Sequence, residues 1–422
     1  MSTQTNALTE QPTRQHKASW LHAPQRLWLR RAIFQVHLWL GIILAAYSVV
    51  IGVTGAILIF NDEIEDAIYA KQLHMTPSPR TTTFNAILTR VNADRPGWIA
   101  DGITKLGKGA AANGFDEEPA LIVMRPADNP KTTNLRYVFV DTNNGSVLLD
   151  RMRYSDWMGF VFHLHLYLLL DRIGLTISGW MALGLLLLCI SGIVVWWPGV
   201  ARWVAAIVLR RRSSWRRFNW DLHSVTGFWC CAALTAVSLT GVYFAFPLPI
   251  AAIAVKLTGG TIQEAAKYVA VPKALPAQAG TPVISVDRAI QTLNAQMADA
   301  PPIFYISLPQ TPTDVYGGIS YYPTRSPYTA ARRAVVDPHT GAVLMTLDTR
   351  TAPRGVKLIQ YFYSIHFGTF AGTKGVLGYT VRGLWVLLGI SPALLAVTGL
   401  IMYWNRKLRG PWQRMRKARL AA

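Results

Sequence analysis

The stretch FQVHLWLGIILAAYSVVIGVTGAIL, residues 34–58, decides the fold class of this chain. An α-helix needs about 20 consecutive apolar residues to cross a bilayer, and this stretch supplies more. His37 nevertheless lies near its start, where an imidazole is costly unless a partner binds it. The stretch therefore predicts a membrane span whose histidine has a specific partner.

Three more apolar blocks follow, and basic residues flank the set asymmetrically. The four blocks are residues 33–60, 175–197, 224–248 and 384–404. Lys and Arg cluster before the first block, between the second and third, and after the fourth, and such residues stay on the cytoplasmic side. We expect a multi-pass membrane protein with both termini in the cytoplasm and with its long connections outside, in the periplasm if the host is a Gram-negative bacterium. The net charge of +20 then reflects topology and contact with the lipid bilayer, and not binding to nucleic acid.

The predicted organisation alternates between spans and long external regions. Cys189, Cys230 and Cys231 all lie in spans, so the external regions contain no disulfide and must fold by core packing. The predicted segments are a cytoplasmic N-terminal segment 1–32, a first span 33–60, a periplasmic module 61–160, an approach and second span 161–200, a basic cytoplasmic loop 201–222, a third span 223–248, a second periplasmic module 249–365, an approach and fourth span 366–404, and a basic cytoplasmic tail 405–422.

The two halves of the chain share their spacing. Gly41 follows His37 at the distance that separates Gly227 from His223, and a Thr-Gly pair follows in each span, at 54–55 and 240–241. The second span ends in SGIVVWW (191–197) and the fourth in TGLIMYW (398–404). We interpret these matches as an internal duplication in one orientation, with a pseudo-twofold axis along the membrane normal.

Each external region shows the pattern of a small α+β module. Helical patterns at 84–93 and 286–297 precede VFVDTNNGSVLLD (138–150) and AVVDPHTGAVLMT (334–346), in which apolar residues flank turn-forming residues. Such segments are typical of β-hairpins. The predicted fold class is therefore membrane α-helical, with four spans arranged as two tandem repeats of span, α+β module and span.

Five of the nine histidines mark the entrances of spans. The predicted topology places His37 and His223 on the cytoplasmic side. It places the other three, His163, His165 and His366, on the external side. Two imidazoles on facing helices are suited to bind one haem iron from above and below. Gly41 and Gly227, one turn from the first pair, leave room for a flat macrocycle or for close approach of helices. The pattern predicts haem ligation by symmetry-related helices.

Other interpretations of the histidines stay open. A histidine at a helix end often reaches the lipid headgroups, and zinc or copper also binds imidazole, although the usual further ligands are missing near either rim. A proton relay would require carboxylates inside the spans, which contain none. His163 and His165 lie about 200° apart around a helix, so only one faces the bundle, and we favour His165. Arg30, Arg31 and Arg216 on the inner side, or Arg172 and Arg382 on the outer side, are candidate partners for haem propionates.

Several segments resemble those of the PepSY-associated transmembrane helix family, whose members include iron-regulated inner-membrane proteins and siderophore-iron reductases. The matching segments are HLWLG (37–41), LHLYLLLDRIG (164–174), DLHSVTGFW (221–229), IHFGTFAG (365–372) and SPALLAVTGLIMYW (391–404). The resemblance covers residues 30 to 408 and implies two b-type haems with His37, His223, His165 and His366 as iron ligands. The sequence departs from the family pattern at His163 and at Asp171, where a glycine often stands.

The resemblance also implies an activity. Proteins of the reductase type carry electrons from a cytoplasmic or membrane donor, not identifiable here, to a ferric siderophore in the periplasm, and reduction releases the iron. We therefore expect a transmembrane ferric-siderophore reductase. The alternative is a haem-free regulatory or scaffold protein whose external modules bind a peptide or a partner protein. A permease ranks third, because the spans lack charged or broken segments at the membrane midplane.

Overall fold

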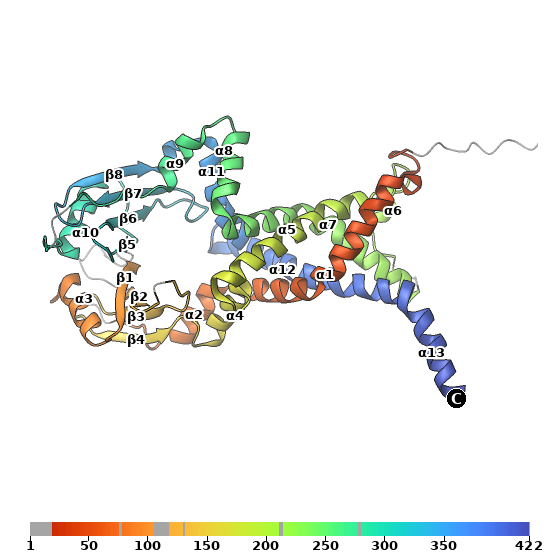
Figure 1. Cartoon of the computed structure of the whole chain (residues 1–422), viewed down its shortest axis with the longest axis horizontal. Helices are drawn as coiled ribbons and strands as arrows, with labels where there is room; N and C mark the ends of the chain where they lie inside the picture. The colour runs from red at the N-terminus through yellow and green to blue at the C-terminus, as the bar shows by residue number, and fades with distance from the viewer. Residues whose placement is uncertain are drawn as a thin grey trace, which may run out of the picture. The chain divides into compact units, whose positions relative to one another are not determined.

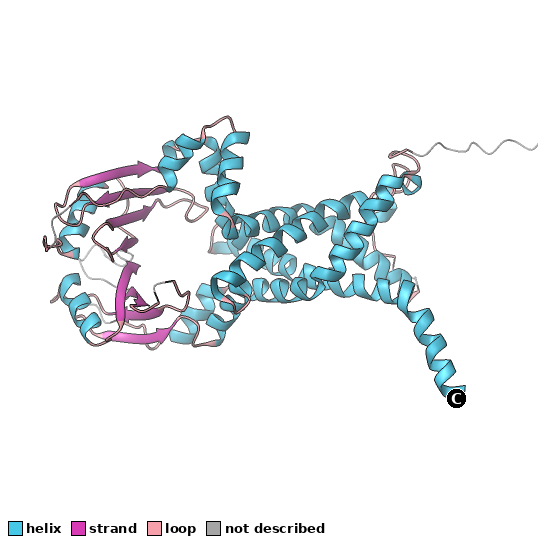
Figure 2. Cartoon of the chain, viewed as in Figure 1, coloured by secondary structure: helices cyan, strands magenta, loops and turns pink. Residues whose placement is uncertain are grey.

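The computed structural model describes residues 19–75, 78–104, 118–129, 131–210, 214–276 and 280–421. Parts of the predicted basic segments 1–32 and 201–222 lie outside these ranges. The chain divides into two compact units. Unit 1 comprises residues 1–46, 184–235 and 394–422, and unit 2 comprises residues 47–183 and 236–393. Figure 1 shows the elements by label, and Figure 2 shows the strands, all of which belong to unit 2.

Among the described residues, four helices are long and apolar enough to cross a membrane, as the sequence predicts. They are α1 (Trp28–Leu58), α5 (Asp171–Trp196), α7 (Trp215–Ala245) and α12 (Gly375–Tyr403), the last continuing through a π-helical turn (Trp404–Leu408) into α13 (Arg409–Ala421). The remaining helices are η1 (Pro24–Arg26), α2 (Asn61–Tyr69), α3 (Phe84–Ala93), α4 (Trp157–Tyr167), α6 (Trp203–Ala206), α8 (Pro247–Leu257), α9 (Ile262–Val269), α10 (Val286–Gln296), η2 (Thr349–Thr351) and α11 (Arg354–Phe367).

Several helix boundaries differ from the predicted ones. The helix of the first span begins at Trp28 and not at 33, and that of the third at Trp215 and not at 223, so His223 lies in the third turn of α7. Hydropathy marks where a helix becomes apolar and not where it begins, which explains both differences. The predicted segment 366–404 contains a break, because α11 ends at the left-handed Gly368 and α12 begins at Gly375.

The sheet of unit 2 corrects the expectation of two separate modules. It has eight antiparallel strands in the order β4-β3-β2-β1-β5-β6-β7-β8. The central pairing of β1 with β5 joins the strands of the two external regions, so each covers an edge that the other would leave open. The strands are β1 (Trp98–Thr104), β2 (Ala120–Pro126), β3 (Arg136–Val140), β4 (Val147–Met152), β5 (Tyr305–Ser307), β6 (Tyr316–Tyr321), β7 (Ala331–Val336) and β8 (Val343–Asp348).

The predicted helices and hairpins of the external regions are confirmed. Helix α3 covers 84–93 and α10 covers 286–296, while β3–β4 and β7–β8 are hairpins. In the two turns, the carboxylates of Asp141 and Asp337 accept backbone N–H groups two residues later, at 2.8 and 3.0 Å. Gly145 and Gly341 close these turns with φ of 76° and 73°, a conformation that glycine adopts without strain.

One core unites the sheet with α3 and α10. The fully buried Ile103, Ile122 and Leu293 belong to it, together with apolar residues of both helices. Asp287 at the start of α10 also accepts the backbone N–H groups of Phe84 and Asn85, at 3.0 and 2.8 Å, and so caps α3. The two external regions therefore fold as one domain.

Candidate cofactor site: four histidine–hydroxyl pairs

Unit 2 brings together the two histidines that the sequence singles out on the external side. His165 lies in the last turn of α4 and His366 in the last turn of α11, with their ring centroids 6.3 Å apart and their planes at 68°. Residues near each histidine in the sequence determine where its helix begins or ends. Asp156 caps α4 by accepting the N–H of Gly159 at 2.6 Å, and α11 ends where Gly368 adopts φ of 66°.

Each of these imidazoles contacts a threonine hydroxyl of a spanning helix. The Nδ1 atom of His165 lies 2.9 Å from Oγ1 of Thr54 on α1. The Nδ1 atom of His366 lies 2.8 Å from Oγ1 of Thr240 on α7. The two histidines are therefore held by helices that carry corresponding Thr-Gly pairs in the sequence.

Unit 1 contains two pairs of the same kind. The Nδ1 atom of His37 lies 3.0 Å from Oγ of Ser191, and that of His223 lies 2.9 Å from Oγ1 of Thr398. Asn219, one turn before His223 on α7, donates to the carbonyl of Thr398 at 3.0 Å and aligns α7 with α12. His37 also lies close enough to His223 to interact with it electrostatically.

The hydrogen bonds around the hydroxyls assign the imidazole tautomer. Each hydroxyl donates its one proton to a carbonyl of its own helix, for example Thr54 to Val50 at 2.6 Å and Thr240 to Val237 at 2.7 Å. Ser191 and Thr398 bond to Leu188 and Leu394 at 3.2 and 2.7 Å. The hydroxyl oxygen is then free to accept, so the proton of the ring lies on Nδ1 and the lone pair lies on Nε2.

Backbone carbonyls, which accept and never donate, also lie close enough to the four imidazoles to interact with them. The carbonyls belong to the residue three positions before each hydroxyl, namely Leu188, Ile51, Leu395 and Val237. This agrees with an Nδ1–H donor in all four rings. A neutral imidazole with Nε2 unprotonated is the form that binds a metal.

A glycine lies beside each imidazole, directly after the hydroxyl residue. A Cβ atom would lie 2.9 Å from Cε1 of His165 at Gly55, and 3.2 Å from Cε1 of His37 at Gly192. The corresponding distances are 3.4 Å for Gly399 to His223 and 3.9 Å for Gly241 to His366. The rings therefore lie against the backbone of the neighbouring helix.

Gly41 and Gly227, which the spacing in the sequence singled out, lie beside leucines of neighbouring helices, and their place beside a flat macrocycle stays a prediction. A Cβ at Gly41 would meet Leu188 at 3.8 Å, and one at Gly227 would meet Leu395 at 3.7 Å, both ordinary contacts. Neither contact involves an imidazole. The residues beside the imidazoles belong instead to a recurring dipeptide, a hydroxyl residue followed by glycine. Its four copies are Ser191-Gly192, Thr398-Gly399, Thr54-Gly55 and Thr240-Gly241, which the sequence presented only as a mark of duplication.

His163 faces away from this arrangement. Its ring stacks on Tyr154 with centroids 4.0 Å apart, and its Nε2 lies 3.5 Å from a carboxylate oxygen of Asp171.

The arginines that the sequence offers as partners for haem propionates have partners within the protein. Arg30 donates to the carbonyl of Val195, and Arg172 donates to the carbonyl of Lys131 at 2.8 Å. Arg382 forms a two-point ion pair with Glu63, so its charge is balanced within the protein.

The spacing in unit 2 fits a metal held between two imidazoles. With metal–imidazole bonds of about 2 Å, two trans imidazoles have ring centroids roughly 6 Å apart. The separation of 6.3 Å between His165 and His366 meets this condition. Within the described ranges, no group of three or more His, Cys, Asp and Glu side chains is placed to hold a bare ion. Two imidazoles are the complete protein ligand set of a bis-histidine haem.

A family model decides the relationship of the chain to known proteins. The model of the PepSY-associated TM region matches residues 34–406. The protein belongs to the PepSY-associated TM family. No curated protein matches the chain. Membership of this family, together with the four apolar helices, identifies a multi-pass membrane protein whose helices contact the lipid bilayer.

Proposed function

We propose that this PepSY-associated protein is a b-type haem protein that passes electrons across the membrane to a ferric siderophore. The observation that carries the proposal is the pairing of His165 with His366, whose ring centroids lie 6.3 Å apart, so that the two imidazoles would be able to hold one haem iron. His37 and His223 form the second ligand pair of the proposal. When bound, haem supplies a one-electron couple, and two axial histidines favour electron transfer over oxygen binding.

The hydroxyl and carbonyl contacts support this role chemically. They keep the Nδ1 proton in place and so hold the Nε2 lone pair ready as a ligand, while a hydrogen bond to the outer nitrogen raises ligand basicity. The neighbouring glycines let each ring lie close to the backbone of the adjoining helix, which restricts its movement. All four histidines are half-buried.

The matched contacts also support the proposed tandem repeat. His37 with Ser191 corresponds to His223 with Thr398, and His165 with Thr54 corresponds to His366 with Thr240. The proposed topology keeps the basic termini in the cytoplasm and unit 2's sheet in the periplasm of a bacterial inner membrane. One electron from a cytoplasmic or membrane donor then converts Fe(III) in the external chelate to Fe(II), which binds hard oxygen ligands less tightly.

An absorption spectrum of the purified protein tests the proposal. We expect a Soret band, and α and β bands that sharpen when dithionite is added, with two haems per chain in a pyridine haemochrome assay. Stopped-flow mixing of the reduced protein with a ferric siderophore should reoxidise the haem. A colourless preparation from haem-sufficient cells, or haem that never reoxidises, would contradict the proposal.

Single-histidine variants test the assignment of ligands. His165→Ala and His366→Ala should each lose the same haem, and His37→Ala and His223→Ala the other. His163→Ala provides a matched control, because it removes a histidine of the same helix two positions away, and it should keep both haems. If His163→Ala loses a haem while His165→Ala does not, the ligand assignment on α4 is wrong.

A further inference from the structure

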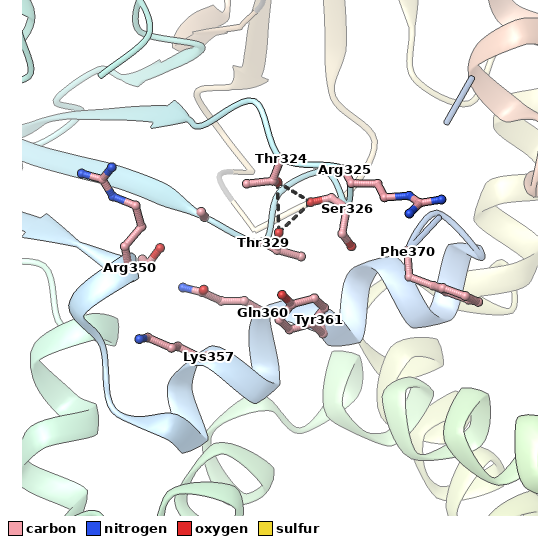
Figure 3. Close-up of a pocket in the computed structure, with 11 residues that line it drawn as sticks. Thr324, Arg325, Ser326, Thr329, Arg350, Lys357, Gln360, Tyr361 and Phe370 are labelled. Carbon is pink, nitrogen blue, oxygen red and sulfur yellow. Dashed lines mark hydrogen bonds between the residues drawn. The ribbon is translucent and has the colours of Figure 1, made fainter. Parts of the chain in front are cut away.

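A cavity in unit 2 lies between α11 and the loop 322–330 that connects β6 to β7. Its volume is about 390 Å³, within the range of roughly 300–1,000 Å³ that small-molecule sites occupy. Figure 3 shows Thr324, Ser326 and Thr329 on the loop, opposite Gln360 and Tyr361 on α11. His366 follows Tyr361 by five residues on the same helix, so the cavity adjoins the helix of a proposed haem ligand.

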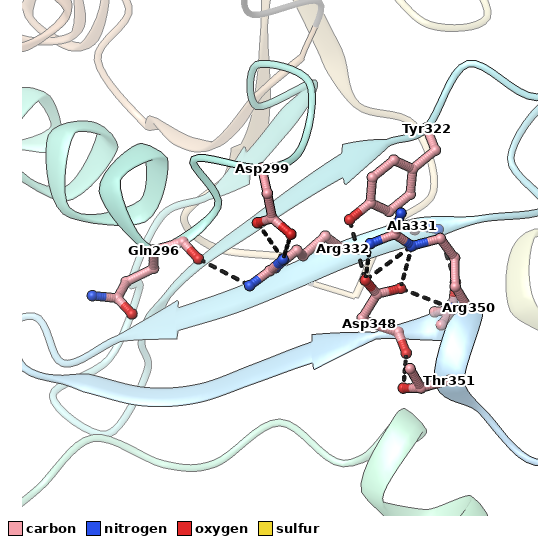
Figure 4. Close-up of polar contacts among 9 residues, drawn as sticks. Gln296, Asp299, Tyr322, Ala331, Arg332, Asp348, Arg350 and Thr351 are labelled. Carbon is pink, nitrogen blue, oxygen red and sulfur yellow. Dashed lines mark hydrogen bonds and ion pairs between the residues drawn. The ribbon is translucent and has the colours of Figure 1, made fainter.

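The charge of the cavity is positive. Arg325, Arg350 and Lys357 line it, and none of its described lining residues is acidic. The charge of Arg350 is balanced from outside the cavity by Asp348, with contacts of 2.6 and 3.0 Å, and its guanidinium lies 3.8 Å from the ring centroid of Tyr322 (Figure 4). Arg325 donates only to a neutral carbonyl, that of Ala371, at 3.3 Å. Lys357 and Arg325 therefore supply positive charge that the lining does not offset.

Ser326 provides an independent indication of a ligand. The residue is 7% exposed and lines the cavity, yet its Oγ makes no hydrogen bond to any described residue. The neighbouring hydroxyls are satisfied, because Thr324 and Thr329 both donate to the carbonyl of Ser326 at 2.6 Å. A buried hydroxyl without a partner is unfavourable, and a ligand oxygen in the cavity would relieve it.

The loop that forms this wall is held in place by α11. Ser364 donates to the carbonyl of Pro327 at 3.0 Å, and the rings of Tyr328 and Tyr363 meet edge to face with centroids 5.0 Å apart. Tyr328 has φ of 62°, which a bulky residue adopts only where its surroundings impose it. The cavity wall is therefore organised before any ligand binds. Along the helix, Tyr361 precedes His366 by five residues, a rise of about 7.5 Å.

We infer that this cavity binds an anionic metal chelate, one that presents carboxylate or similar oxyanions at its surface. Lys357 and Arg325 donate charge-assisted hydrogen bonds to those oxygens, and Ser326 Oγ donates a neutral one. Identifying the metal as ferric iron rests on the proposed function. Among siderophores, the substrates of this protein are then the negatively charged ones, and neutral chelates gain nothing from the two uncompensated cations.

Calorimetric titration of the full-length protein in a neutral detergent tests this inference without any redox step. Gallium(III) citrate serves as the anionic probe, because gallium(III) resembles ferric iron in its ligands but is not reduced. Gallium(III) acetohydroxamate is the neutral probe, and metal-free citrate separates a chelate site from a plain carboxylate site. Wild type should bind gallium(III) citrate in preference to both others, with an affinity that falls as salt rises.

Variants locate the binding. Lys357→Gln and Arg325→Gln should each raise the Kd for gallium(III) citrate about tenfold, and Lys357→Arg should restore most of the affinity. Lys267→Gln on α9 removes an exposed lysine elsewhere in unit 2 and should change nothing. Equal binding of the neutral chelate, equal binding of free citrate, or an unchanged Kd in Lys357→Gln would each overturn the inference. The spectrum of the same samples reports haem separately, so a failure of the haem proposal is distinguishable from a failure here.

Discussion

Thr54 on α1 accepts the Nδ1 proton of His165, which follows 111 positions later in the chain, across a distance of 2.9 Å. The hydroxyl of Thr54 is committed to the carbonyl of Val50, so the direction of the hydrogen bond to the ring is determined. The same relationship recurs at three more histidines. A helix hydroxyl followed by a glycine is thus the common support of every proposed ligand.

Removing the hydroxyl should weaken one haem. Thr54→Val keeps the shape of the side chain but leaves the Nδ1 proton of His165 without its hydroxyl acceptor. Loss of such an outer partner typically costs 10–100-fold in affinity, so we expect faster transfer of one haem to apomyoglobin and a higher reduction potential for that haem. Thr54→Ser should retain the wild-type behaviour. Identical transfer rates for wild type and Thr54→Val would show that the hydroxyl does not support the ligand.

Adding a methyl group beside the ring should have unequal effects in the two halves. Gly55→Ala places a Cβ 2.9 Å from Cε1 of His165, closer than side chains approach, so the ring must move. Gly241→Ala places its Cβ 3.9 Å from His366, an ordinary contact. We expect Gly55→Ala to lower the haem content or broaden the low-spin electron paramagnetic resonance signal, and Gly241→Ala to match wild type. Equal spectra for both variants would refute this placement of the rings.

The ion pair between Glu63 and Arg382 should make unit 2 sensitive to acid. The hydrogen bond that Arg382 donates is the largest cause that holds the pKa of Glu63 below its usual value of 4.5. A carboxyl with a depressed folded-state pKa stabilises the protein above its unfolded pKa, and this stabilisation is lost as pH falls through the folded value. Arg382 is 4% exposed, so its unpaired charge would be unfavourable.

Thermal unfolding of the detergent-solubilised protein checks this pH dependence. At pH 7, Glu63→Gln should unfold at a lower temperature than wild type. The difference should shrink as pH falls below 4.5 and through the lowered pKa that Glu63 has in the folded protein. Asp128→Asn, at an exposed position after β2, is the control and should leave the curve nearly unchanged. A difference between wild type and Glu63→Gln that is constant from pH 7 to pH 3 would exclude Glu63 as the titrating group.

Asp171 occupies a strained position at the start of α5. Its φ is 49°, in the left-handed region, and its carboxylate accepts the hydroxyl of Thr133. Asp171→Gly and Asp171→Ala both lose that hydrogen bond, but only alanine keeps the strain, so we expect the glycine variant to be more stable by about 1 kcal/mol. Chemical denaturation measures the difference. Alanine being as stable as glycine would indicate that the turn adopts another conformation.

Much of the fold is readable from the sequence, because its signals are local. Apolar length predicts four spans, periodicity predicts α3 and α10, and the turn residues around Gly145 and Gly341 predict two hairpins. The joining of both external regions into one sheet is not local. It depends on the pairing of Ile103 with Ile306, two residues far apart in the chain, and no periodic pattern reports such a contact.

The sequence by itself singled out five histidines at the entrances of the spans, and the family resemblance favoured His37, His165, His223 and His366 among them as proposed ligands. Only the tertiary structure decided which atoms meet them. The hydroxyls of Ser191, Thr398, Thr54 and Thr240 reach the rings across helix interfaces, and His163 turns toward Tyr154 instead. The physical reason is that a hydrogen bond between helices depends on their rotation and depth, which packing sets and the order of residues along one helix does not.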